Sequence, residues 1–143
     1  MRLAPVLLAG AFALAGCGKS DQPADAPAGG DAAVEAAAPT IEPTAAMGEQ
    51  VFRRCVACHT IDAGGGNGIG PNLHGIVDRP VASHAGFSYS GAMKAKGGTW
   101  DAAALDAFLA EPMKALPGTR MAFAGVIDPG DRKALILYME TQK

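Results

Sequence analysis

The 143-residue sequence has few aromatic residues, an odd number of cysteines and no hydrophobic run long enough for a membrane-spanning helix. One Trp, two Tyr and five Phe supply little bulk for a hydrophobic core. Three cysteines cannot all pair within one chain, which argues against a simple disulfide framework. The apolar stretch at residues 3–15 is too short to cross a bilayer. Basic residues are too sparse for a nucleic-acid-binding face.

The net charge of −2 is unevenly distributed along the chain. Residues 19–46 carry one Lys against five acids, a net charge of −4, whereas residues 47–143 carry ten Lys or Arg against nine acids, a net charge of +1. Residues 17–46 are rich in Ala, Pro and acidic residues and lack aromatics, so they cannot bury enough surface to order themselves. We therefore expect a disordered tether at 17–46 and one folded domain at 47–143.

The N-terminus has the pattern of an export signal. Arg2 precedes the 13 apolar residues at 3–15, which is the length of a signal-peptide core. The string LAGC at residues 14–17 resembles the bacterial lipobox, which implies cleavage after Gly16 and a lipid on Cys17. We therefore expect a signal peptide at 1–16 and a periplasmic protein anchored to a membrane through Cys17. The alternative is an ordinary signal peptide in which Cys17 is incidental.

The periodicity of the domain predicts an all-α fold with three main helices and long loops. The main helices are expected at residues 47–58, 101–110 and 128–141, and a shorter one at 90–96. Asp is a preferred N-cap residue and Pro a preferred residue at the first helical position, so Asp128 and Pro129 indicate the start of the last helix. Loops this long in so small a domain suggest that they wrap around a cofactor.

The string CVACH at residues 55–59 is a C-x-x-C-H haem-attachment motif. The thiols of Cys55 and Cys58, three positions apart on one turn, can form thioethers with the two vinyl groups of a porphyrin. His59 then directs its imidazole at the iron from the same side. The motif therefore predicts one covalently bound haem c with His59 as an axial ligand.

Three alternatives compete with this interpretation. A thioredoxin-like redox pair needs a βαβ context, which the helical pattern lacks. A zinc site needs two further ligands at short spacing, and His74 and His84 are ten positions apart. A chance match to five residues is the third. Haem is favoured because c-type attachment takes place outside the cytoplasm, where the export signal sends the chain.

Further strings resemble the class I cytochromes c, including the mitochondrial kind. They are GPNLHG at 70–75, GFSYS at 86–90, TW at 99–100 and PGTRMAFAG at 117–125. With the haem motif and the last helix, the resemblance covers nearly all of residues 48–141. It implies the cytochrome c fold, with helices and loops wrapped around one haem.

The resemblance also implies roles for single residues. Met121 is implied as the second axial ligand, opposite His59, and the Pro71 carbonyl as the acceptor of the His59 Nδ1–H. The hydrogen-bond partners of the haem propionates are implied at Arg79, Tyr89 and Trp100.

Recognition of redox partners is implied for three basic residues, Arg54, Lys114 and Arg120, although several family lysines are missing around the haem edge. At high pH, lysines of the loop before the Met ligand displace it in related proteins, and Lys114 is the only lysine there. Phe108 and Met93 replace a Tyr and an Asn of mitochondrial members, which removes polar groups near the haem.

The implied function is single-electron transfer by a monomer that is not an enzyme and does not bind nucleic acid. The carrier would shuttle between membrane respiratory complexes, with a quinol-oxidising complex as donor and a terminal oxidase or another protein as acceptor. One alternative is a haem-based sensor or weak peroxidase, which requires Met121 to leave the iron readily. Another is an integral subunit of an oxidase complex, which would co-purify at fixed stoichiometry.

The first prediction concerns the anchor. Cys17→Ser removes the acceptor of the lipid, so the protein should move from the membrane to the soluble periplasmic fraction, as measured by quantifying the protein in each fraction. Retention of the variant on membranes after a high-salt wash would contradict the lipid anchor.

Overall fold

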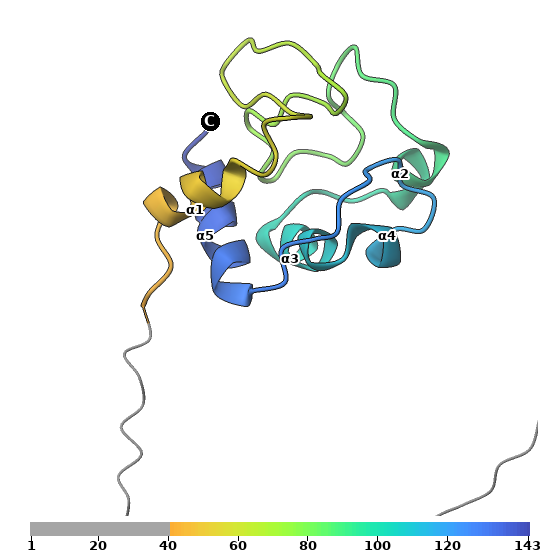
Figure 1. Ribbon diagram of the computed structural model, residues 1–143. Helices are drawn as coiled ribbons and strands as arrows, with labels where there is room; N and C mark the ends of the chain where they lie inside the picture. The colour runs from red at the N-terminus through yellow and green to blue at the C-terminus, as the bar shows by residue number, and fades with distance from the viewer. Residues whose placement is uncertain (1–40) are drawn as a thin grey trace, which may run out of the picture. The chain divides into compact units, whose positions relative to one another are not determined.

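A computed structural model describes residues 41–143 (Figure 1). The expected signal peptide at 1–16, the expected lipid site Cys17 and the tether as far as residue 40 lie outside the described residues. Within 41–143 the regular elements are all helices. They are α1 (Ala45–Phe52), α2 (Gly91–Lys96), α3 (Ala102–Ala110), α4 (Pro112–Ala115) and α5 (Pro129–Glu140). The fold is therefore all-α, as the sequence predicts.

The first helix is shifted relative to the sequence prediction of residues 47–58. It begins at Ala45, where the Thr44 side chain caps it by accepting from the Met47 N–H at 3.3 Å. The α-helix ends at Phe52, and the chain continues in tighter turns. In these turns several N–H groups bond to the carbonyl three residues back, as from Cys55 to Phe52 at 2.7 Å. The last residues assigned to the tether thus begin α1.

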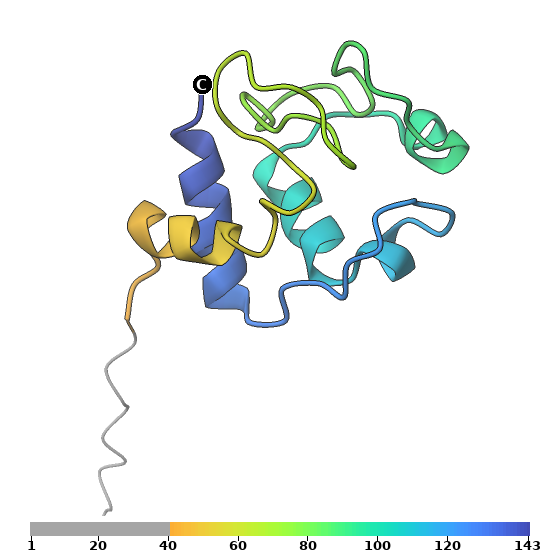
Figure 2. The same ribbon diagram turned by 45° about the horizontal axis from the view of Figure 1, so that its top comes forward.

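The helices α1 and α5 cross in close contact (Figures 1 and 2). A Cβ atom at Gly48 would overlap the carbonyl of Ala134 and lie 2.8 Å from Tyr138 Cβ, so only glycine allows the two backbones to approach this closely. The rings of Phe52 and Tyr138 pack across the same crossing, with centroids 5.5 Å apart. This contact joins the beginning of the domain to its end.

The third main helix, α3, packs against α5 and completes the core. It is capped by Asp101, whose carboxylate accepts from the Ala104 N–H at 2.7 Å. The short helix α4 is absent from the sequence prediction. Pro112 stands two residues beyond the last residue of α3, where a proline stops that helix. It also occupies the first position of a new helical turn, where proline is well tolerated. The buried hydrophobic core is formed by residues of all three main helices and the loops: Val51, Phe52, Ile61, Ile76, Trp100, Leu105, Phe108, Leu109, Val126, Leu135, Ile136 and Met139.

Two long loops, residues 53–90 and 116–128, form most of the remaining chain and pack on this helical framework. The loop from residue 53 to 90 is fixed to the C-terminus by the Gly75 N–H, which donates to the Gln142 carbonyl at 2.6 Å. An isolated bridge between Pro80 and Thr99 ties the same loop to the segment before α3. None of the helices in residues 41–143 has the length and hydropathy that crossing a membrane requires.

A substitution at the helix crossing tests this packing. Gly48→Ala should lower the free energy of unfolding by about 1–3 kcal/mol, because the added methyl group must displace the α5 backbone. The measurement is thermal unfolding followed by circular dichroism. Gly91→Ala is the matched control: Gly91 also lies in a helix, and a Cβ there meets no heavy atom within 4 Å. Equal melting temperatures for the two variants would contradict the account of the crossing.

Candidate haem site

A cavity of about 650 Å³ lies between the three main helices and the two long loops. This volume is in the range of sites that hold a cofactor or a drug-sized ligand. The side chains that line its interior are mainly apolar and include Phe52 of α1, Leu105 and Phe108 of α3, and Leu135 and Met139 of α5. The cavity therefore offers an apolar, water-poor environment for a flat hydrophobic group such as a porphyrin.

The haem-attachment motif borders this cavity. Cys55 and Cys58 both line it, and neither forms a disulfide. The backbone between them is one tight turn, with the Cys58 N–H donating to the Cys55 carbonyl at 3.0 Å. Burial raises the pKa of the Cys55 thiol, although the positive charge of Arg54 partly offsets it, so the thiol is protonated at neutral pH. Two thiols on one turn facing one cavity fit covalent attachment of a haem.

The imidazole of His59 is oriented by the loop opposite it. Its Nδ1 lies 2.7 Å from the Pro71 carbonyl oxygen. Because a carbonyl only accepts, Nδ1 carries the proton and the lone pair of Nε2 is available for a metal. Burial lowers the pKa of His59, which keeps the ring neutral at pH 7, the form that binds iron.

The loop approaches this ring closely because the residue before Pro71 is a glycine, Gly70. A Cβ atom at Gly70 would come to 2.6 Å from His59 Nδ1. The Gly70 N–H donates to the Cys58 carbonyl at 2.8 Å, so the loop is also bonded to the attachment turn.

Met121 borders the same cavity from the loop between α4 and α5. Its N–H donates to the Thr119 hydroxyl at 3.3 Å, a hydrogen bond within the loop itself. Positive φ angles at Gly118 (86°) and Gly125 (105°) mark the sharp bends on either side. The structure thus brings Met121 to the same cavity as His59, from a segment distant in sequence.

The three residues expected near the haem propionates are placed differently. Tyr89 and Trp100 line the cavity, and Trp100 is buried against Phe108 with ring centroids 5.0 Å apart. Arg79 is not among the lining residues. Its guanidinium donates to the carbonyls of His74 at 3.0 Å and Asn72 at 3.1 Å, and burial lowers its pKa. Arg79 therefore holds the loop behind the cavity.

The three basic residues expected to bind partners are also divided. Arg54 and Arg120 line the cavity, and Lys114 does not. Arg54 lies 3.6 Å from the Asp131 carboxylate, and Arg120 donates to the Ser88 carbonyl. The exposed Lys114 pairs at 2.9 Å with the Glu111 carboxylate on the outside of α4.

Several lining residues received no role from sequence reasoning, among them Ile69, Thr119 and Phe123. Ile69 is 80% exposed, so it is an apolar residue at the mouth of the cavity. The sequence signal that could have indicated Ile69 is the presence of a large apolar residue within a glycine-rich loop. The position of Thr119 two residues before Met121 was the signal for its hydrogen bond.

The alternatives to haem find no support in the described part of the chain. In residues 41–143, no three His, Cys, Asp or Glu side chains gather as a zinc site would need. The same residues contain no βαβ unit to support a thioredoxin-like pair. The apolar cavity, the two thiols and the oriented imidazole together define a haem-binding helical protein.

Comparison with known proteins assigns the family. The family model "Cytochrome c" matches residues 45–143, so the chain belongs to the cytochrome c family. The chain is 46% identical over 99 residues to a cytochrome c from Cochliobolus lunatus, covering 68% of this chain and 92% of that one. It is 43% identical over 95 residues to a cytochrome c2 from Rhodomicrobium vannielii, covering 66% of this chain and 76% of that one.

A solved structure agrees with these sequence relatives. Cytochrome cH from Methylobacterium extorquens superposes with a TM-score of 0.64 at 41% identity, covering 68% of this chain and 98% of that chain. The chain therefore has the cytochrome c fold of the class I family and carries a covalent c-type haem at Cys55 and Cys58. It is an electron carrier.

Proposed function

We propose that this cytochrome transfers single electrons through a haem whose iron is ligated by His59 and Met121. The observation that carries this proposal is that one cavity is bordered by both side chains and by both attachment thiols. When bound, the haem supplies one-electron exchange between ferrous and ferric iron. If His59 and Met121 both hold the iron, small ligands would have no open site, and electron transfer would need little rearrangement of the chain.

The protein sets the properties of that site with its own residues. The Pro71 carbonyl fixes the tautomer of His59 and increases the basicity of Nε2. A thioether ligand from Met121 raises the reduction potential relative to a second imidazole. The apolar lining, including Phe108 and Met93, disfavours the extra positive charge of the ferric form and raises the potential further.

Two polar groups on the cavity lining are proposed to donate hydrogen bonds to the haem propionates. The Tyr89 hydroxyl and the Trp100 indole N–H are hydrogen-bond donors on lining residues, which suits them to carboxylates. Arg79, held behind the cavity by backbone carbonyls, contributes positive charge rather than a wall of the site.

The place of this carrier in the cell is proposed from the N-terminal sequence. The signal peptide at 1–16, the lipid site at Cys17 and the tether would place the domain in the periplasm, attached to a membrane. A tethered carrier suits exchange between a quinol-oxidising complex and a terminal oxidase. Arg54 and Arg120, on the cavity lining, are proposed to meet these partners, and Lys114 acts only at the periphery of that surface.

The ligand assignment is tested by Met121→Ala. Removing the thioether opens one axial position, so the reduced variant should bind carbon monoxide and its reduction potential should fall by on the order of 100 mV or more. Visible spectra and a redox titration measure both effects. Met113→Ala is the control, since Met113 is 65% exposed and does not line the cavity. A Met121→Ala protein with the parent spectrum and potential would exclude Met121 as a ligand.

A pH titration tests the role of Lys114 in alkaline ligand exchange. The hydrogen bond that the Lys114 ammonium donates to the Glu111 carboxylate raises the pKa of Lys114, so the ammonium persists to higher pH and the amine becomes available later. Glu111→Gln should therefore lower the pH midpoint at which the ferric protein loses its Met–iron charge-transfer band. Lys114→Ala should raise that midpoint or abolish the low-spin alkaline species. Unchanged midpoints in both variants would show that another lysine replaces Met121.

A further inference from the structure

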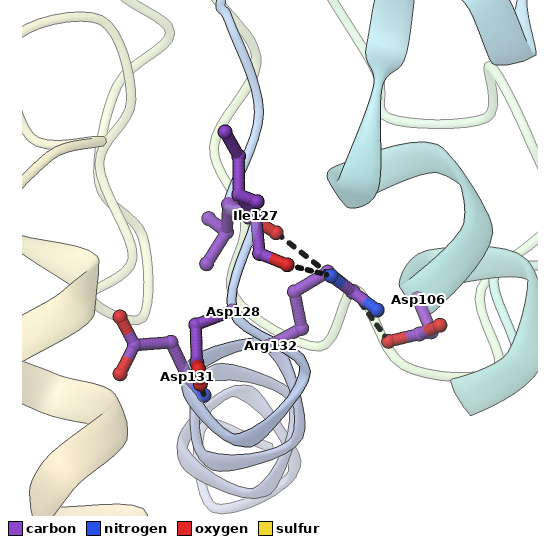
Figure 3. A network of polar contacts seen from close by, with 6 residues as sticks. Asp106, Ile127, Asp128, Asp131 and Arg132 are labelled. Atoms are coloured by element: carbon purple, nitrogen blue, oxygen red, sulfur yellow. Dashed lines mark hydrogen bonds and ion pairs between the residues drawn. The ribbon is translucent and has the colours of Figure 1, made fainter. Parts of the chain in front are cut away.

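The Arg132 side chain joins three separate parts of the domain (Figure 3). From the first turn of α5, its Nη1 donates to the carbonyls of Val126 at 2.9 Å and Ile127 at 2.8 Å. Its Nε donates to the Asp106 carboxylate of α3 at 2.7 Å. The Arg132 side chain is only 13% exposed, whereas that of Asp106 is 47% exposed. One guanidinium thus links α3, α5 and the end of the Met121 loop.

The helix dipole alone does not explain why a cation occupies this position in the first turn of α5. Arg132 lies near the N-terminus of α5, where the helix dipole favours negative charge. Asp128 satisfies that preference as the N-cap, and Asp131 pairs with Arg54 on the other side of the helix. Asp106 is therefore the carboxylate that directly compensates the charge of Arg132. The contacts of Arg132 are directed at the loop carbonyls rather than at the helix.

These carbonyls belong to the segment that ends the Met121 loop. Val126 is fully buried, and its N–H donates to the Leu109 carbonyl at 2.8 Å. Gly125 lies so close to α3 that a Cβ atom would overlap the Ala110 carbonyl. The loop is thus docked on α3 from one side and held by Arg132 from the other, five residues after Met121.

We propose that the Asp106–Arg132 pair is a positioning device that holds the Met121 loop closed and so limits how often Met121 leaves the iron. This inference rests on the proposed ligation by Met121. Asp106 fixes the guanidinium plane, and Arg132 fixes the two carbonyls. Loss of the carboxylate leaves Arg132 free to turn toward solvent, which releases the C-terminal end of the loop.

Imidazole binding to the ferric holoprotein measures this opening. Imidazole occupies the position of Met121 only in molecules whose loop has opened, so its apparent affinity scales with the open fraction. Asp106→Asn should bind imidazole about threefold to fivefold more tightly than the parent, as expected for loss of a half-exposed ion pair. Asp106→Glu, which keeps the carboxylate, should stay within about twofold of the parent.

The matched control is Asp131→Asn. It removes a carboxylate one residue from Arg132, in an ion pair that does not touch the loop, as Figure 3 shows by the direction in which Asp131 points. Its imidazole affinity should equal that of the parent even where its melting temperature falls as far as that of Asp106→Asn. Equal affinities for Asp106→Asn and Asp131→Asn would overturn the inference, because the pair would then serve only general stability.

A second variant and one spectrum complete the test. In Arg132→Lys the single ammonium cannot reach both carbonyls and the carboxylate, so this variant should bind imidazole more tightly than Asp106→Asn does. If Arg132→Lys fails to fold, the comparison of the Asp106 variants decides the test. A parent protein without the Met–iron charge-transfer band would overturn the proposed ligation itself. A parent with the band, combined with unchanged affinity in Asp106→Asn, would overturn only the positioning role.

Discussion

The structure depends on placing two thiols and an imidazole on a single turn beside an apolar cavity. Cys55, Cys58 and His59 all belong to the tight turns that follow α1, and the helices and loops close around the space they face. A domain of this size has little surface to bury without a cofactor. Covalent attachment fixes the haem within the core, so the long loops need only cover it.

Three glycines allow the chain to close around that site. Gly48 lets α1 approach α5, Gly70 lets its loop approach His59, and Gly125 lets the Met121 loop approach α3. In each case a Cβ atom would collide with backbone or with the His59 ring. The same constraint therefore applies at the helix crossing, beside His59 and beside the Met121 loop. At each place two segments approach so closely that only a glycine fits between them. The Asp106–Arg132 pair adds a polar contact where the third approach ends.

Much of this arrangement could be predicted from the sequence, because short motifs carry local chemistry. The C-x-x-C-H turn, the helices α3 and α5, the Asp128 cap of α5 and the cytochrome c fold all follow from strings of neighbouring residues. The early end of α1 could not be predicted, since tight turns and an α-helix share the same pattern at Cys55. The helix α4 could not be predicted either, because Pro112 both stops α3 and begins the new turn, and a proline after a helix indicates only the stop. The pair of Arg132 with Asp106 joins residues 26 positions apart and depends on how α3 packs against α5, which no local pattern records. The bonds of Arg79 to the carbonyls of His74 and Asn72 depend on the path of an irregular loop.

The central proposal is that His59 and Met121 would both bind the iron, so that the protein would exchange one electron without opening the site. A potentiometric titration of the holoprotein at neutral pH, performed with and without carbon monoxide, tests it most directly. We predict one reversible one-electron step with the same midpoint under both conditions, because carbon monoxide finds no free position. A midpoint that rises under carbon monoxide would show that the ferrous iron binds it. That result would contradict the account and favour a sensor or a weak peroxidase.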